Sequence, residues 1–117
     1  MQLREAIECF KPFNEQEEKD RLQILHWMDT GLDLYTRENG MAHFTASAWV
    51  MSRDHRKVLM AFHKIFQSWA WLGGHADGEK DLLQTALREV REESGVTHVK
   101  PLCTDIFSLE ILPVAGH

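Results

Sequence analysis

Apolar and polar positions follow a helical period in the first part of the chain. The pair Asn14 and Glu17 resembles a capping box, in which side chains three residues apart satisfy the free backbone amides at a helix start. The apolar positions that follow recur at spacings of three to four residues. We therefore expect an amphipathic helix from about Glu15 to Asp29, ended by Gly31, within an N-terminal helical segment of residues 1–31.

A period of two follows, which is typical of half-buried strands. Asn39-Gly40 marks a turn, and apolar and polar residues then alternate from His43 to Val50. The polar stretch from Ser52 to Lys57 indicates a connecting turn. The expected strands cover residues 43–50, 58–62 and, before Pro113, 107–111, and residues 69–72 are expected to form a short strand or a loop.

The segment that ends at Gly95 combines an apolar face with an acidic one. At about 100° per residue, Glu89 and Glu93 lie nearly above one another on a helix, and Glu92 lies roughly 100° round from Glu93. The three carboxylates can converge on one cation, and oxygen ligands of this kind suit Mg²⁺ or Mn²⁺. The apolar stripe beside them, which can pack on a sheet, consists of Leu83, Ala86, Leu87 and Val90.

Glycines flank this helix and separate two interpretations of it. Charged residues on a helix are usually a solvated face, and here Arg88 and Glu92 have the i, i+4 spacing of a surface ion pair. However, the Gly73-Gly74 pair before the helix permits close approach of the backbone to a ligand, and Gly95 suits a left-handed helix end. A surface helix does not need the paired glycines, so we favour a binding site.

Length, composition and charge set further limits. The 117 residues are 44% hydrophobic and 26% charged, which predicts one globular domain over residues 1–117. The formal net charge of −5 disfavours binding to nucleic-acid phosphates, so an anionic substrate would need a cation to bridge it to acidic residues.

The cysteines and the N-terminus bear on the compartment. Cys9 and Cys103 have no metal-binding spacing, which argues against a disulfide framework and for two small packing residues in a reduced setting. The chain shows neither a signal-peptide pattern nor an apolar run long enough for a membrane span. We expect a cytoplasmic protein that does not interact with a membrane.

Residues 73–96 resemble the signature box of the Nudix hydrolases. That box has a Gly, five residues, a Glu, seven residues, and then Arg-Glu-hydrophobic-x-Glu-Glu-x-Gly-hydrophobic. Counting from Gly74, residues 88–96 match this pattern throughout. Lys80, however, occupies the place of the first motif glutamate, and Glu79 stands one residue early. The wider resemblance covers about residues 43–114 and is nearest to an uncharacterised bacterial subgroup.

The resemblance implies a fold, an activity and a set of site residues. The fold is α+β, an α/β/α sandwich with a Nudix-like mixed β-sheet flanked by helices. The activity is that of a hydrolase: a metal-dependent pyrophosphohydrolase (pyrophosphatase) that cleaves a nucleoside diphosphate linked to another moiety, with Mg²⁺ or Mn²⁺ as cofactor. The implied catalytic residues are Arg88, Glu89, Glu92 and Glu93, and the implied metal-binding residues are the three glutamates and the carbonyl of Gly74. Arg88 would orient the glutamates, while the identity of the general base stays open.

Two residues are candidates for contact with the small-molecule nucleotide substrate. His75 follows the glycines, although isolated histidines are more often packing or surface residues. Trp71 is the nearest tryptophan to the glycines and could stack on a base, as could Trp49 and Trp69, since such stacking contributes roughly 1–3 kcal/mol per base. Filling the packing faces of a sheet is the commoner role for tryptophans on strands.

Alternatives to catalysis come from the box itself. Lys80 favours a non-catalytic Nudix-like domain that binds a nucleotide and regulates another protein. A plain α+β interaction module, with the acidic helix as a solvated face, is a third hypothesis. Because Nudix domains usually continue well past the box, we also expect that the C-terminal part of the domain is missing after His117. A homodimer would then be one way to cover the exposed sheet edge.

Overall fold

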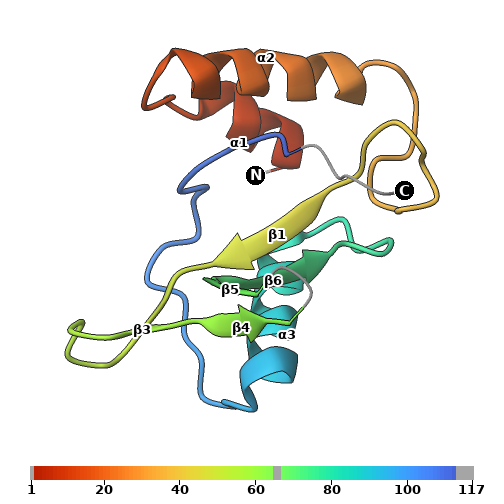
Figure 1. The fold of residues 1–117 in the computed structure, drawn as a ribbon. Coiled ribbons are helices and arrows are strands. Elements are labelled where there is room, and N and C mark those ends of the chain that lie inside the picture. Colours follow the sequence, from red (N-terminus) through yellow and green to blue (C-terminus); the bar gives the residue numbers. More distant parts are fainter. Residues whose placement is uncertain (1, 65–66, 113–117) are drawn as a thin grey trace. The chain divides into compact units, whose positions relative to one another are not determined.

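The computed structural model describes residues 2–64 and 67–112, which form three helices and six short strands (Figure 1). They divide into two compact units. One unit contains the described residues up to Leu32 and from Cys103 onward, and the other spans Asp33–Leu102. The expectation of a single domain over the whole chain stays a prediction.

The first unit contains α1 (Leu3–Cys9) and α2 (Glu15–Met28), which pack against each other. The expected capping residue is confirmed, because the side chain of Asn14 accepts a hydrogen bond of 2.8 Å from the backbone amide of Glu17. The carboxylate of Glu17 returns to the amide of Phe13, one residue earlier than in a regular capping box. The helix predicted from Glu15 to Asp29 is thus confirmed to within one residue, and Gly31 follows with φ of +80°.

The strand expected over residues 107–111 is wrong. These residues have no strand pairing in the part of the chain that the structure describes. Instead, the amides of Leu109 and Ile111 donate to the carboxylates of Glu17 at 3.2 Å and Asp20 at 3.3 Å. The alternating pattern therefore marks an extended segment whose backbone is satisfied by acidic side chains of α2 in place of a neighbouring strand.

The second unit has three chain segments that pair with one another in turn. The strands are β1 (Thr45–Ala48), β2 (Val50–Met51), β3 (Val58–Leu59), β4 (Ala61–His63), β5 (Ser68–Ala70) and β6 (Leu72–His75). The pairs are β1 with β6, β2 with β3, and β4 with β5. Each segment changes partner at one residue, namely Trp49, Met60 or Trp71. The predicted strands 43–50 and 58–62 are therefore each divided in two.

All three strand pairs are antiparallel, so the mixed sheet expected from the resemblance is not found in the described residues. For β2 and β3, the short connection explains this. Ser52 donates to the carbonyl of Lys57 at 2.9 Å and closes a tight turn between β2 and β3, as the polar stretch predicted. A parallel pair would need a crossover of a dozen or more residues. The class α+β is confirmed, as small antiparallel sheets packed on a helix, whereas the sandwich stays a prediction.

Helix α3 (Leu82–Ser94) packs on β1 and β6 (Figure 1). Its predicted apolar stripe is confirmed: Ala86 and Val90 are buried, and the two leucines of the stripe are half-buried. Against them lie the buried Leu72 and Ala76 of the β6 region. The helix ends as expected at Gly95, whose φ of +75° is the left-handed conformation that glycine adopts without strain.

The structure bears on two expectations, one about the packing of the cysteines and one about membrane spans. Cys9 and Cys103 are both exposed and unbridged, so they are not the packing residues that we expected. Within residues 2–64 and 67–112, no helix has the length and apolar character needed to cross a bilayer.

Candidate functional site

Two side chains of α3 form hydrogen bonds to the backbone of β6, and a third lies against this strand. The amide of Gly73 donates to Oε1 of Glu93 at 2.9 Å. One turn earlier on the helix, Nη2 of Arg88 donates to the carbonyl of His75 at 2.8 Å and lies 3.4 Å from Oε1 of Glu89. Glu93 bonds to Gly73, and Glu89 lies against Gly74. Two glutamates four residues apart on the helix thus meet two adjacent residues of the strand. The structure thus brings Arg88, Glu89 and Glu93 to the β6–α3 contact, whereas no described hydrogen bond joins the exposed Glu92 to this strand.

The paired glycines of β6 allow other groups of the protein to approach the strand closely. These groups are a neighbouring strand and a glutamate side chain. A side chain at Gly74 would collide with the carboxylate of Glu89. A side chain at Gly73 would collide with the neighbouring strand, about the Cα and Cβ of Ser47 and the carbonyl of Ala46. Neither glycine has a positive φ. The two glycines therefore differ in function: Gly73 permits strand pairing, and Gly74 makes room for a site carboxylate.

The glutamates differ in their surroundings. Only 18% of the Glu89 side chain is exposed, whereas Glu92 and Glu93 are exposed residues. Among residues 2–64 and 67–112, no three His, Cys, Asp or Glu side chains lie close enough together to hold a metal ion in this conformation. Glu89 and Glu93 instead accept hydrogen bonds from Arg88 and Gly73. The metal assignment to the three glutamates and Gly74 stays a prediction.

The donor set nevertheless suits a hard divalent cation. It consists of carboxylate oxygens on one turn of a helix, and Gly74 lies directly against one of them. Arg88 is held by the carbonyl of His75, so it cannot leave the carboxylate of Glu89 without losing a second hydrogen bond. The surface pair of Arg88 with Glu92, which the solvated-face interpretation included, is not among the described ion pairs.

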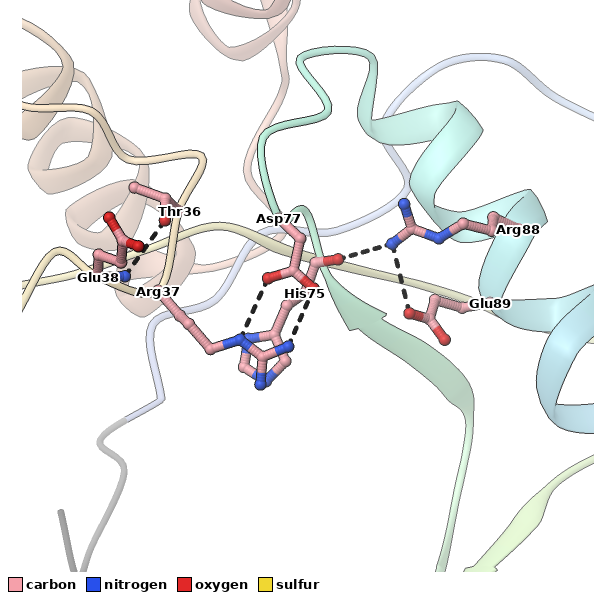
Figure 2. A network of polar contacts seen from close by, with 7 residues as sticks. All are labelled: Thr36, Arg37, Glu38, His75, Asp77, Arg88 and Glu89. Carbon is pink, nitrogen blue, oxygen red and sulfur yellow. Dashed lines mark hydrogen bonds and ion pairs between the residues drawn. The ribbon is translucent and has the colours of Figure 1, made fainter.

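His75 lies at the end of β6, and Figure 2 draws it with the charged side chains of its polar network. Its ring centroid is 5.0 Å from that of His43, at an interplanar angle of 33°. Its Nδ1 atom is buried and has no hydrogen-bond partner among the described residues. Burial lowers the pKa of His75, and the charge of Arg37 lowers it further, so the neutral imidazole is favoured.

An ion pair next to His75 went unpredicted. Arg37 lies 40 residues from Asp77 in the sequence, yet its Nε and Nη2 atoms donate to the two carboxylate oxygens at 3.1 and 2.9 Å (Figure 2). Asp77 has φ of +47°, and the amide of Gly78 donates to the carbonyl of Tyr35 at 2.6 Å. No periodicity or motif marks Arg37, because the contact depends on two loops meeting.

The tryptophans of the strands are more exposed than sheet packing predicts. Trp49, Trp69 and Trp71 are 49%, 66% and 39% exposed. Trp49 and Trp71 contact each other edge to face, with ring centroids 5.1 Å apart. Continuing the β1–β6 register by one residue would place these two opposite each other, because Ala48 pairs with Leu72. A base-stacking role for Trp71 stays a prediction.

The N-terminal end of the box has its own local structure. Lys80, at the motif's glutamate position, is exposed in the loop before α3. Glu79, one residue early, accepts a hydrogen bond of 2.9 Å from the amide of Asp81. Asp81 in turn caps α3 by accepting from the amide of Leu83 at 3.2 Å. Glu79 therefore serves the start of the helix and does not replace the missing glutamate in this conformation.

Comparison with protein families identifies the class. The chain matches the NUDIX domain family model over residues 41–110, which is more than half of its length. The chain therefore belongs to the Nudix family, as residues 73–96 indicated. A search of curated proteins gives no significant match.

Proposed function

We propose that the protein is a divalent-metal-dependent pyrophosphohydrolase that cleaves a nucleoside diphosphate linked to another moiety. Family membership makes a pyrophosphohydrolase the first hypothesis, and the geometry at α3 is the observation that supports it here. Glu89 and Glu93 face β6 from one side of the helix, and Gly74 leaves space for the first of them. A helix whose charges formed only a solvated face would not need these contacts.

Each residue has a chemical task under this proposal. Glu89, Glu92 and Glu93, with the carbonyl of Gly74, would hold Mg²⁺ or Mn²⁺, which when bound neutralises the diphosphate and makes bound water more acidic. Arg88 holds the carboxylate of Glu89 by a charge-assisted hydrogen bond and keeps it aligned with β6.

The reaction itself is hydrolysis of a phosphoanhydride. Water forms a new bond to phosphorus, the bridging P–O bond breaks, and the proton of the water goes to a glutamate carboxylate that acts as general base. The products are a nucleoside monophosphate and the phosphorylated second moiety. All three glutamates are candidates for the base.

A substrate panel tests the proposal. The chain would be incubated with nucleoside diphosphate sugars, dinucleoside polyphosphates and nucleoside diphosphates, with Mg²⁺, with Mn²⁺ or with chelator. We expect metal-dependent release of a nucleoside monophosphate from at least one class, measured by ion-exchange chromatography. Binding without turnover for every substrate would support the regulatory alternative, and neither binding nor turnover would contradict both.

The regulatory alternative rests on one observation, the lysine at the motif's glutamate position. Lys80→Glu restores the motif at an exposed loop position, so we expect stability to change by no more than about 0.5 kcal/mol. If the box is aligned correctly, the variant binds Mn²⁺ more tightly in a calorimetric titration. Weaker binding than in the unaltered chain would show that the N-terminal part of the box is aligned wrongly.

A further inference from the structure

Arg37 is a cation at the edge of the candidate site that the proposed chemistry does not yet use. The other arginine of the site, Arg88, has its hydrogen bonds directed to His75 and Glu89. Arg37 uses Nε and Nη2 for Asp77, and its Nη1 atom has no partner in the part of the chain that the structure describes (Figure 2). Its side chain is 57% exposed, so a ligand can reach it.

The neighbours of Arg37 suit a phosphoryl group. The ring centroids of His43 and His75 are 5.0 Å apart, and Arg37 is near enough for its charge to act on the ring of His75. Guanidinium and imidazole N–H groups are the usual donors to phosphate oxygens, and the guanidinium can offer two parallel N–H groups. His75 also follows Gly74 directly, so these donors lie at the end of the strand that carries the glutamate contacts.

The partner of Arg37 holds the guanidinium in an accessible position. Asp77 is 46% exposed and lies in a loop that is tied to the opposite loop by the hydrogen bond between Gly78 and Tyr35. Exposed ion pairs are weak, so an anion can compete with the carboxylate for the guanidinium.

We propose that Arg37 binds a phosphoryl oxygen of the substrate, beside the imidazoles of His43 and His75, and that Asp77 holds the guanidinium in place until the anion arrives. The identity of the natural anion as the diphosphate of a nucleotide rests on the proposed function, whereas the anion site itself does not. Arg37 thereby gives an acidic protein a direct contact to its anionic substrate, separate from the contact through the metal.

The two partners of the ion pair should have opposite effects, which separates binding from mere support of the loops. The probe is inorganic pyrophosphate with chelator present, so that no metal takes part, and binding is followed by calorimetry and by the ring signals of the histidines. Arg37→Gln should weaken binding roughly tenfold or more, because a charge-assisted contact is lost. Asp77→Asn, which tolerates the positive φ, should tighten binding roughly threefold or more because the competing carboxylate is gone.

Two matched variants control for charge alone. Arg56→Gln removes an exposed arginine of the β2–β3 turn, and Glu38→Gln removes an exposed carboxylate next to Arg37. Both should leave pyrophosphate affinity within about twofold, because neither side chain is in the ion pair of Arg37 with Asp77 and exposed charges are screened by salt. Thermal unfolding of each variant checks that it is folded.

Several outcomes would overturn the proposal: no pyrophosphate binding by the unaltered chain, equal binding after Arg37→Gln, or equal weakening by Arg37→Gln and Asp77→Asn. Its failure differs from that of the proposed hydrolase. Opposite effects of the two variants without turnover of any nucleotide would support the anion site and contradict the hydrolase. Metal-dependent turnover whose KM and kcat are unchanged by Arg37→Gln would support the hydrolase and contradict the anion site. A raised KM with kcat retained would support both the hydrolase and the anion site.

Discussion

At the scale of single residues, the adjacent glycines of β6 show how neighbouring positions acquire different functions. Gly73 faces the strand β1, where a side chain would meet backbone and Cβ atoms that cannot move. Gly74 faces the end of a flexible glutamate side chain, which can rotate away. Glycine is therefore needed for strand pairing at Gly73 and for the position of the Glu89 carboxylate at Gly74.

Alanine substitution should separate these two functions. We expect Gly73→Ala to lower the free energy of unfolding by about 1–3 kcal/mol or more, because the added methyl group overpacks the β1–β6 pair. Gly74→Ala should cost less stability but weaken Mn²⁺ binding, since it displaces the carboxylate of Glu89. Urea unfolding and metal titration of both variants provide the test. Equal effects of the two substitutions on both measurements would contradict the assignment.

Glu93 tests the metal assignment directly. Glu93→Gln keeps an oxygen that can accept from Gly73 but removes the charge. We expect turnover to fall by a factor on the order of 10²–10⁴, and the rise in Tm caused by Mg²⁺ or Mn²⁺ to disappear. The Tm without metal should stay within a few degrees of the original value. Glu38→Gln, an equal change of charge outside the box, is the control. Turnover that survived substitution of each box glutamate in turn would exclude the catalytic assignment.

At the scale of elements, α3 has two faces and two well-formed ends. Its apolar face buries Ala86 and Val90 against the strands, and its acidic face carries the candidate ligands. A helix that carries neighbouring carboxylates loses a few tenths of a kcal/mol per like-charge pair, so its caps have added importance. Asp81 at the start and Gly95 at the end supply them.

The cap gives a prediction for this element. Asp81→Ala should lower the free energy of unfolding by about 1 kcal/mol, because the amide of Leu83 loses its acceptor. Asp81→Asn keeps an acceptor oxygen and should cost clearly less. Chemical denaturation of the three proteins measures the difference. If Asn and Ala were equally destabilising, charge near the helix start, and not the hydrogen bond, would be the stabilising factor.

At the scale of the whole molecule, the net charge affects how a substrate can bind. The chain has a formal net charge of −5, yet its candidate substrate is an anion. Family membership makes a divalent cation the expected bridge, and Arg37 is the proposed second one. The ion pairs of Arg4 with Asp29 and of Arg37 with Asp77 lie at exposed positions, so their effect on stability depends on salt and pH.

The pH dependence has a defined sign for Asp77. Its hydrogen bond to Arg37 lowers its pKa in the folded protein, so the unfolded chain takes up the proton more readily. The contribution to stability is therefore present above the ordinary aspartate pKa of about 4 and is lost as the pH falls through and below that value. We expect the urea midpoints of the unaltered chain and Asp77→Asn to approach each other as the pH falls from neutral to below about 4. A difference that grew on acidification would contradict this.

Local sequence by itself determined the helices, the turn and the family. The capping residue Asn14, the apolar stripe of α3 and the left-handed Gly95 are short-range features, because each depends on residues within a few positions of one another. The spacing of the box gave the same family that the comparison found. Only the presence of the strands, and not their partners, could be read in this way.

Tertiary structure decided what depends on contacts distant in sequence. Residues 107–111 alternate like a strand, but the acidic side chains of α2 bind their backbone amides. The partners of the six strands depend on contacts between segments at least several residues apart. The same is true of the ion pair of Arg37 with Asp77 and of the contact between the rings of His43 and His75. Periodicity describes which face of an element is apolar, whereas the identity of the facing element depends on how the chain closes its loops.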